Sequence, residues 1–208
     1  MITADLVKKW ILRLAEVYAA EKAYLTELDS PIGDADHGIN LDRGFSAVVV
    51  EFEKSNPETI SEMLKLTAMT LIRTVGGASG PLYGTWFLKA SIAASNYEKL
   101  DAAHFVKVVE AAVEGVAQRG KAALNDKTML DVWIPVVERI KEKLDDGENI
   151  QALLLEAEEV AAERLKATIP MIARKGRASF LGERSIGHQD PGATSSFFLI
   201  RTAREIFE

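Results

Sequence analysis

Hydrophobic residues recur at steps of three and four along most of this chain. In the first segment Trp10, Leu14, Leu25 and their neighbours follow this spacing, which places apolar side chains on one face of an α-helix. Thr3 is suited to cap that helix, and the pattern ends near residues 29–31. The same periodicity predicts a helix that opens at Pro57 and stops at Gly76-Gly77, another that starts at Gly80-Pro81, and further helices over 101–119, 128–145, 149–174 and 193–207.

One segment has an ambiguous pattern. Phe45 to Phe52 contains Val48-Val49-Val50, a β-branched run that a buried strand would also accommodate. Because no second strand of comparable strength is available to pair with it, a buried helix is the better prediction. Pro135 and Pro170 fall inside helical patterns and are expected to bend those helices. We therefore predict an all-α protein with a single domain over residues 1–208, an antiparallel bundle or barrel of about eight helices.

Composition and charge narrow the classes of function. The chain has 208 residues, a formal net charge of -6 and a pI near 5.3, so it has no overall attraction to nucleic acid or to an anionic membrane. It contains no cysteine, which excludes disulfides and thiolate metal sites. Met1 leads directly into a charged amphipathic segment, and no apolar run reaches the roughly 18 residues of a membrane span. A soluble cytoplasmic protein is expected.

Three irregular connections interrupt the helices, and the first of them is acidic. Asp29, Asp34 and Asp36 lie within eight residues, and like charges this close repel one another unless a cation neutralises them. Carboxylate oxygens favour Mg²⁺, Ca²⁺ or Mn²⁺. An EF-hand is excluded because Phe45 stands where the loop needs a glutamate. The alternative is that these aspartates only cap helices and form turns.

The start of the next helix offers a phosphate site beside the acidic loop. Gly38 and Asn40 lie where that helix begins, and free backbone N–H groups with a positive dipole end bind anions. The second connection, 76–81, also leads into a helix. Its glycines allow close approach of a ligand and Ser79 could contact phosphate, although such a turn is usually only a turn.

The third connection, 175–192, mixes cations with glycines. Arg177 and Arg184 carry planar guanidinium groups suited to phosphate, and Phe180 is an apolar residue that favours docking over a purely solvated loop. A separate stretch, 115–122, nearly matches a phosphate-binding P-loop. Ala122 replaces the required hydroxyl residue and a helix precedes the stretch, so a P-loop is rejected.

Taken together, these segments resemble the L subunit of dihydroxyacetone kinases, the DhaL or DAK2 family. The similarity spans nearly the whole chain at the order and spacing that the family shows. The matching residues are IGDADHG at 32–38 with Asn40 and Arg43-Gly44-Phe45, GGASGPLYG at 76–84, Arg119-Gly120-Lys121, Asp126–Met129 with Asp131-Val132-Trp133, and ARKGRASFLGERSIGHQDPGAT at 173–194.

The resemblance implies an eight-helix antiparallel barrel with the nucleotide at one end. It implies that Asp29, Asp34 and Asp36 ligate two Mg²⁺ ions that bridge to the diphosphate of a tightly bound ADP. The nucleotide contacts it implies are His37, Gly38, Ile39, Asn40, Ala78, Ser79, Gly120, Met129, Arg177, Asp190, Pro191 and Gly192.

The implied activity is that of the phosphoenolpyruvate-dependent form of the kinase. A phosphocarrier subunit of the sugar phosphotransferase system converts bound ADP to ATP, and the phosphoryl group passes to dihydroxyacetone held by a partner subunit. Two alternatives are the nucleotide module of a fatty-acid kinase and a nucleotide-sensing regulator that binds a transcription factor. No catalytic side chain is expected: there is no cysteine, His104 lies in a plain helix, and His188 is the main rival to a nucleotide carrier.

Overall fold

The computed structural model describes residues 1–208 and is built almost entirely from helices. One isolated bridge between Ile2 and Leu100 is the sole β-type pairing. The elements are α1 (Ala4–Ala20), α2 (Lys22–Asp29), α3 (His37–Ser55), α4 (Ile60–Thr74), α5 (Ser79–Ala93), α6 (Ala102–Gly120), α7 (Leu130–Asp145), α8 (Ile150–Ala167), the 3₁₀ segment η1 (Arg177–Ser185) and α9 (Pro191–Phe207).

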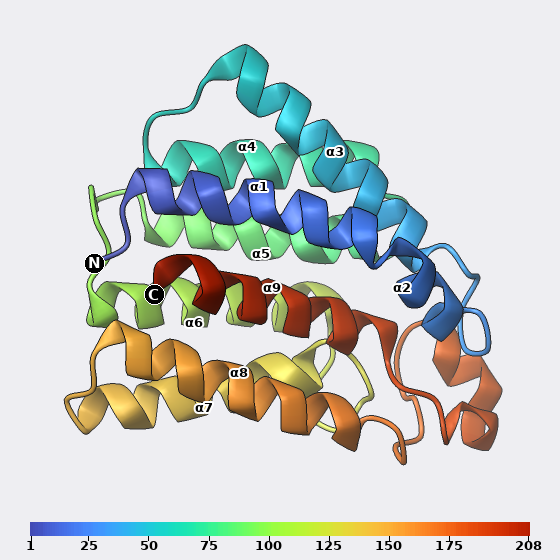
Figure 1. The fold of residues 1–208 in the computed structure, drawn as a ribbon. Coiled ribbons are helices and arrows are strands. Elements are labelled where there is room, and N and C mark those ends of the chain that lie inside the picture. Colours follow the sequence, from blue (N-terminus) through green and yellow to red (C-terminus); the bar gives the residue numbers. More distant parts are fainter.

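The long helices form a closed antiparallel ring. Each of α3 to α9 packs against the next in chain order, and α1 closes the ring by packing against both α3 and α9 (Figure 1). The short helix α2 continues the direction of α1 and lies across α3 and α9. The ring confirms the predicted all-α barrel, including the helical state of Val48-Val49-Val50 within α3.

Local capping explains where four of these helices begin. The side chains of Thr3, Asp101 and Asn149 each accept a hydrogen bond from a backbone N–H of the first turn of α1, α6 and α8. Thr59 and Glu62 form a reciprocal capping box at the start of α4. These side chains satisfy N–H groups that have no partner inside the helix.

Several predicted boundaries were wrong. The first helix is interrupted at Glu21, which separates α1 from α2. Helix α4 begins at Ile60, after the Thr59 cap, and not at Pro57. Helix α8 ends at Ala167, so Pro170 lies in the following turn and bends no helix. Pro135 does lie inside α7, as predicted.

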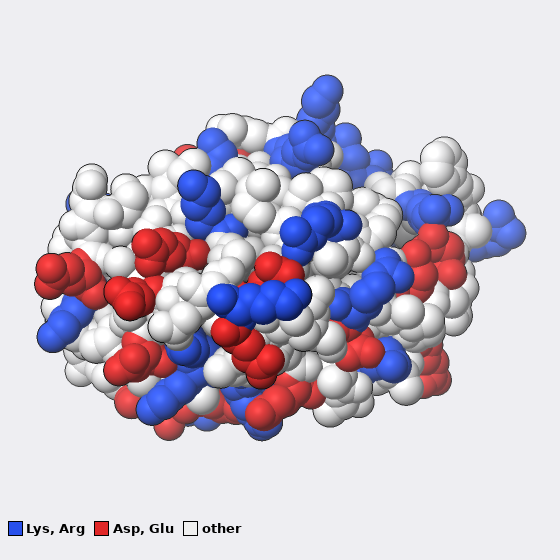
Figure 2. Space-filling view, turned by 90° about the horizontal axis from the view of Figure 1, so that it is seen from above, with Lys and Arg blue, Asp and Glu red and all other residues white.

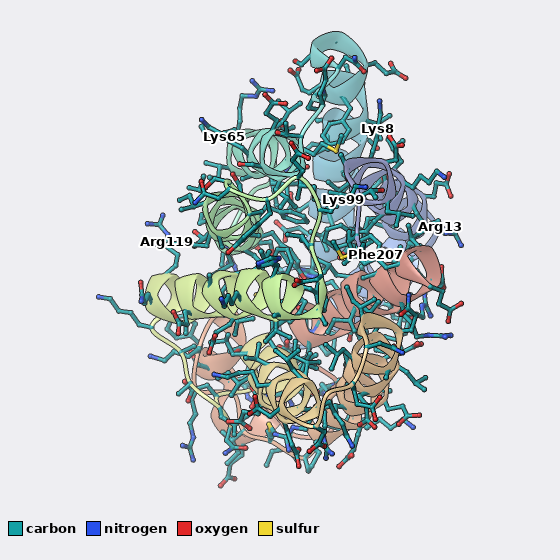
Figure 3. All side chains as sticks on the ribbon, turned by 90° about the vertical axis from the view of Figure 1, so that its left-hand side faces the viewer. Lys8, Arg13, Lys65, Lys99, Arg119 and Phe207 are labelled. Atoms are coloured by element: carbon teal, nitrogen blue, oxygen red, sulfur yellow. The ribbon has the colours of Figure 1, made fainter.

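The apolar faces of the ring helices meet in one core. A chain of aromatic rings crosses it: the centroids of Trp10 and Trp86 lie 6.2 Å apart, and those of Trp86 and Trp133 lie 5.2 Å apart. Figure 3, viewed along the ring, shows Lys8, Arg13 and Lys65 on the outside of the helices. Both signs of charge are interspersed over the face shown in Figure 2. No helix is long and apolar enough to cross a lipid bilayer.

The antiparallel order gathers the irregular connections at one end of the ring. Helices α3, α5, α7 and α9 all begin at this end, which carries α2 and η1 and lies at the right of Figure 1. The segments 30–36, 75–78, 121–129 and 168–190 join helices there. Residues that are far apart in the sequence therefore meet around one cavity.

Candidate functional site

A cavity of about 350 Å³ opens between these connections. Its wall includes the first residues of α3, α5, α7 and α9, namely His37, Ser79, Leu130 and Pro191. Helix N-termini carry unpaired N–H groups and the positive end of the helix dipole. Several of them directed at one space make the cavity suited to an anionic ligand such as phosphate.

The acidic loop contributes three carboxylates to the cavity wall. One oxygen from each of Asp29, Asp34 and Asp36 lies within 4.8 Å of the others. Asp29 is the anchor of this group because it is buried and its Oδ2 accepts hydrogen bonds from the backbone N–H groups of Asp36 (3.0 Å) and His37 (3.3 Å). A set of hard oxygen donors at this spacing fits a divalent cation such as Mg²⁺.

Arg177 faces the acidic group from η1. Its Nη2 lies 2.9 Å from Asp34 Oδ2, and the side chains remain 67% and 34% exposed. Exposed ion pairs of this kind contribute about 0–1 kcal/mol to stability. The guanidinium group is therefore held at the cavity by a contact weak enough to be exchanged for a ligand.

His37 lies at the centre of a buried hydrogen-bond chain behind the cavity. Its Nδ1 is 3.1 Å from Ser79 Oγ and its Nε2 is 2.8 Å from Ser195 Oγ. Tyr83 Oη lies 2.6 Å from the same Ser195 Oγ. Burial lowers the pKa of His37, against the opposing pull of Asp29 and other nearby carboxylates, so the imidazole is neutral at pH 7.

Asp190 caps α9 at the floor of the cavity. Its Oδ2 accepts a hydrogen bond of 2.7 Å from Ala193 N–H. Burial raises the pKa of Asp190 to about 7, and the bond from Ala193 N–H only partly offsets that effect. This carboxyl group therefore titrates in the physiological range.

Lys127 holds two connections together beside Asp190. Its Nζ donates to the carbonyl oxygens of Ser185 (2.6 Å), Met171 (3.1 Å) and Ile169 (3.4 Å). A buried ammonium group needs such partners to offset the loss of water. Lys127 thereby ties the segment after α6 to the segment that carries η1.

The structure brings most of the expected nucleotide contacts to this cavity. The expected residues that line it are His37, Ala78, Ser79, Gly120, Met129, Arg177, Asp190, Pro191 and Gly192, together with all three aspartates. Of the histidines, only His37 is among the lining residues, whereas His188 and His104 are not.

Three expected contacts lie outside the cavity lining. Gly38 packs on α2, where a Cβ would come within 2.1 Å of the carbonyl oxygen of Lys22. Ile39 is half exposed, and the Asn40 side chain accepts a hydrogen bond from Arg43. These residues occupy the first turn of α3. Because none of them lines the cavity, their contact with a nucleotide remains a prediction.

Two participants were missed from the sequence. Tyr83 and Ser195 are almost completely buried inside helices, and their positions in the sequence look like ordinary core positions. The one indication was the run of hydroxyl residues Thr194-Ser195-Ser196, because buried hydroxyl groups need hydrogen-bond partners.

Comparisons with known proteins identify related sequences. The family model of the DAK2 domain matches residues 31–205. The "PEP-dependent dihydroxyacetone kinase, ADP-binding subunit DhaL" of Escherichia coli strain K12 is 46% identical over 94% of this chain and 93% of its own length. The "PTS-dependent dihydroxyacetone kinase, ADP-binding subunit DhaL" of Lactococcus lactis is 42% identical over 99% of both chains.

A solved structure shares the fold. The crystal structure of the dihydroxyacetone kinase from C. freundii in complex with AMP-PNP and Mg²⁺ superposes with a TM-score of 0.72 at 19% identity, covering 99% of this chain and 34% of that chain. The native form of that kinase gives a TM-score of 0.75 at 17% identity, covering 99% of this chain and 35% of that chain. The family match over most of the sequence, with relatives at least 42% identical over nearly their full length, shows that this chain belongs to the DAK2 domain family.

Proposed function

We propose that this chain is the nucleotide-binding subunit of a phosphoenolpyruvate-dependent dihydroxyacetone kinase. In this function, a phosphocarrier subunit phosphorylates ADP held in the cavity, and the phosphoryl group is passed to dihydroxyacetone on a partner subunit to give dihydroxyacetone phosphate. The observation that carries the proposal is the acidic group Asp29, Asp34 and Asp36 at a cavity lined by the starts of α3, α5, α7 and α9. The names of the relatives support the same activity.

The acidic group is proposed to hold two Mg²⁺ ions. Magnesium bound there would offset negative charge on phosphate oxygens, which is the main requirement of phosphoryl transfer. Asp29 is fixed by the two backbone N–H groups, and Asp34 and Asp36 extend from the loop beside it. When a cation binds the Asp34 carboxylate, the planar guanidinium group of Arg177 is free to donate hydrogen bonds to phosphate.

The rest of the cavity suits the nucleoside part of the ligand. Its volume of about 350 Å³ lies within the usual range for small-molecule sites. Apolar side chains line the region next to Gly120, among them Leu82 and Val116. We assign the phosphates to the end with His37 and Ser79, and the adenine to this apolar region.

The segment η1 is proposed to contact the sugar-bearing partner. Gly176, Gly182 and Gly187 have positive φ values, so η1 is bounded and interrupted by conformations that favour glycine. Phe180 on this segment is 87% exposed, an uncommon state for a phenylalanine. Arg177 is assigned to the nucleotide and Arg184 to the partner.

The extent of the match to the relatives favours a separate subunit over the alternatives. The E. coli and L. lactis relatives match over almost their whole length, so residues 1–208 are proposed to be one nucleotide-binding domain. Neither relative is named as part of a fatty-acid kinase. Binding to a transcription regulator is retained as a proposed second role, and the cytoplasm as the proposed location.

A reconstituted assay tests the proposal. The chain is mixed with the sugar-binding and phosphocarrier subunits of the relatives, phosphoenolpyruvate, Mg²⁺ and ADP, and dihydroxyacetone phosphate is measured. Product formation that needs this chain, ADP and Mg²⁺ together is the expected result. No product, with partner subunits that work with their own nucleotide-binding subunit, would contradict the proposal.

A further inference from the structure

The proposed function does not use the buried hydrogen bonds that join Tyr83, Ser195, His37 and Ser79. Ser195 is absent from the cavity lining, whereas Tyr83 contributes to it, and their hydroxyl groups connect through His37 to Ser79 at the cavity wall. Ser195, Tyr83 and His37 are 0%, 1% and 7% exposed, whereas Ser79 is half-buried and faces the cavity. A polar chain thus runs from the core of the ring to the proposed phosphate position.

The number of protons restricts the directions in which these hydrogen bonds can run. Ser195 has one hydroxyl proton but four possible partners, because the carbonyl oxygens of Pro191 and Gly192 also lie 3.1 Å from its Oγ. If Ser195 donates to a carbonyl group, His37 must donate through Nε2 and accept the Ser79 proton at Nδ1. Ser79 then has no proton to offer to a ligand in the cavity.

The opposite arrangement makes Ser79 a donor. Tyr83 donates to Ser195, Ser195 donates to His37 Nε2, and His37 Nδ1–H donates to Ser79 Oγ, so that the Ser79 proton points to the cavity. All the hydrogen bonds then run in one direction, and bonds aligned in this way strengthen one another at low dielectric. An anion beside Ser79 selects this arrangement because a hydrogen bond to a charged acceptor is stronger than one to a neutral acceptor.

We infer that Tyr83 and Ser195 are positioning residues that, through the His37 imidazole, hold Ser79 as a hydrogen-bond donor to the phosphate of the nucleotide. This inference rests on the proposed function, since it needs a phosphate at Ser79. The imidazole only relays the direction of the hydrogen bonds: the nitrogen that carries the proton decides whether His37 donates to Ser79 or to Ser195. No bond in the nucleotide is broken by these residues.

The test is the affinity for Mg²⁺-ADP and for adenosine in single and double variants. Ser79→Ala should weaken ADP binding by about tenfold, the effect of losing one hydrogen bond to a charged group. Ser195→Ala and Tyr83→Phe should weaken it by about three- to tenfold, and adenosine, which lacks phosphate, should bind all variants equally. Because Ser195 acts through Ser79, Ser79→Ala/Ser195→Ala should bind ADP like Ser79→Ala alone.

A matched control removes a buried hydroxyl group elsewhere on α9, the helix that carries Ser195. Thr202 donates only to the carbonyl oxygen of Phe198 within α9, so Thr202→Val should leave ADP affinity unchanged. The ¹⁵N chemical shifts of His37 give a second readout, with the Nδ1–H form expected in wild type bound to Mg²⁺-ADP. Tyr83→Phe loses only the hydroxyl group, and it takes the place of Ser195→Ala in the test if Ser195→Ala does not fold.

The outcomes separate this inference from the proposed function. Independent, multiplying effects of Ser79→Ala and Ser195→Ala, equal losses for adenosine, or an Nε2–H form in the ADP complex would overturn the inference while ADP binding itself stands. If wild type does not bind Mg²⁺-ADP, the proposed function fails, and the inference fails with it.

Discussion

Gly33 lies directly against the side chain of Asp29: a Cβ atom at position 33 would come within 1.9 Å of Asp29 Oδ1. The backbone N–H of Gly33 also donates to the carbonyl oxygen of Asp29, at 2.6 Å. The loop therefore folds back onto the residue that begins it. The absence of a side chain at Gly33 leaves the Asp29 carboxylate in place to accept from Asp36 and His37.

This contact predicts the effect of Gly33→Ala. The added methyl group must displace the Asp29 carboxylate, so Mg²⁺-dependent ADP affinity should fall by at least about tenfold, the effect of losing a hydrogen-bonded charged contact. The helices do not depend on the contact, and the circular dichroism spectrum should be unchanged. Ser30→Ala, at an exposed residue in the same loop, is the control. Wild-type affinity in Gly33→Ala, measured by calorimetry, would remove Asp29 from the metal site.

Removing one negative charge from the acidic group should separate binding from stability. Asp36→Asn should greatly weaken ADP binding in Mg²⁺ while leaving the melting temperature unchanged or slightly raised, because like charges in the loop repel one another. Asp146→Asn changes an exposed aspartate after α7 and should alter neither quantity. A variant that binds Mg²⁺-ADP as wild type does would show that Asp36 is not a ligand.

The two arginines of η1 should have different effects. Arg177→Gln loses the guanidinium group that faces Asp34, and ADP affinity should fall by about tenfold or more, as for a lost charge-assisted hydrogen bond. Arg184→Gln should leave ADP affinity unchanged and weaken association with the sugar-binding subunit, measured by surface plasmon resonance. If both variants lowered ADP affinity equally and the partner still bound normally, this division of roles would be wrong.

The raised pKa of Asp190 predicts a pH dependence of stability. Its pKa is about 7 in the folded protein against an ordinary value of 3.8, so the folded state holds a proton that the unfolded state releases between those pH values. Its contribution to the free energy of unfolding is therefore present below about pH 4 and is lost as pH rises to about 7, by roughly 4 kcal/mol in all.

Asp190→Asn tests this dependence, because asparagine keeps the cap of α9 but does not titrate. Urea denaturation of wild type and Asp190→Asn from pH 4 to pH 8 should show stabilities that diverge as pH rises, with the variant retaining more. The control is Asp101→Asn, which makes the same change at the exposed cap of α6. Parallel curves for wild type and Asp190→Asn would contradict the raised pKa.

The sequence predicts the fold well because each ring helix buries one regular face. Trp10 and Leu14 repeat with the helical period, and so does the apolar face of α3 around Val48. The break at Glu21 and the end of α8 before Pro170 were not predicted, since the hydrophobic pattern continues across both. The end of α8 agrees with a local rule, because Pro170 disfavours a helical conformation at the residue before it.

The site was predictable where its chemistry is carried by a loop. Three aspartates in eight residues indicate a cation site whatever the fold around them. Tyr83, Ser195 and Lys127 could not be assigned in the same way, because their roles depend on partners up to 158 residues away in the chain. Likewise, resemblance to a family gives positions such as Asn40 but not the direction in which the side chain points.

We expect the phosphoryl group to be carried by the bound nucleotide and by no side chain of this protein. The cavity supports this claim because His188 is absent from its lining and both ring nitrogens of His37 are engaged by hydroxyl groups. The most direct measurement passes ³²P from phosphoenolpyruvate through the phosphocarrier subunit to the ADP-loaded chain without dihydroxyacetone, and then separates denatured protein from nucleotide. Label recovered as ATP is the predicted result, and acid-labile label retained on His37 or His188 would contradict it.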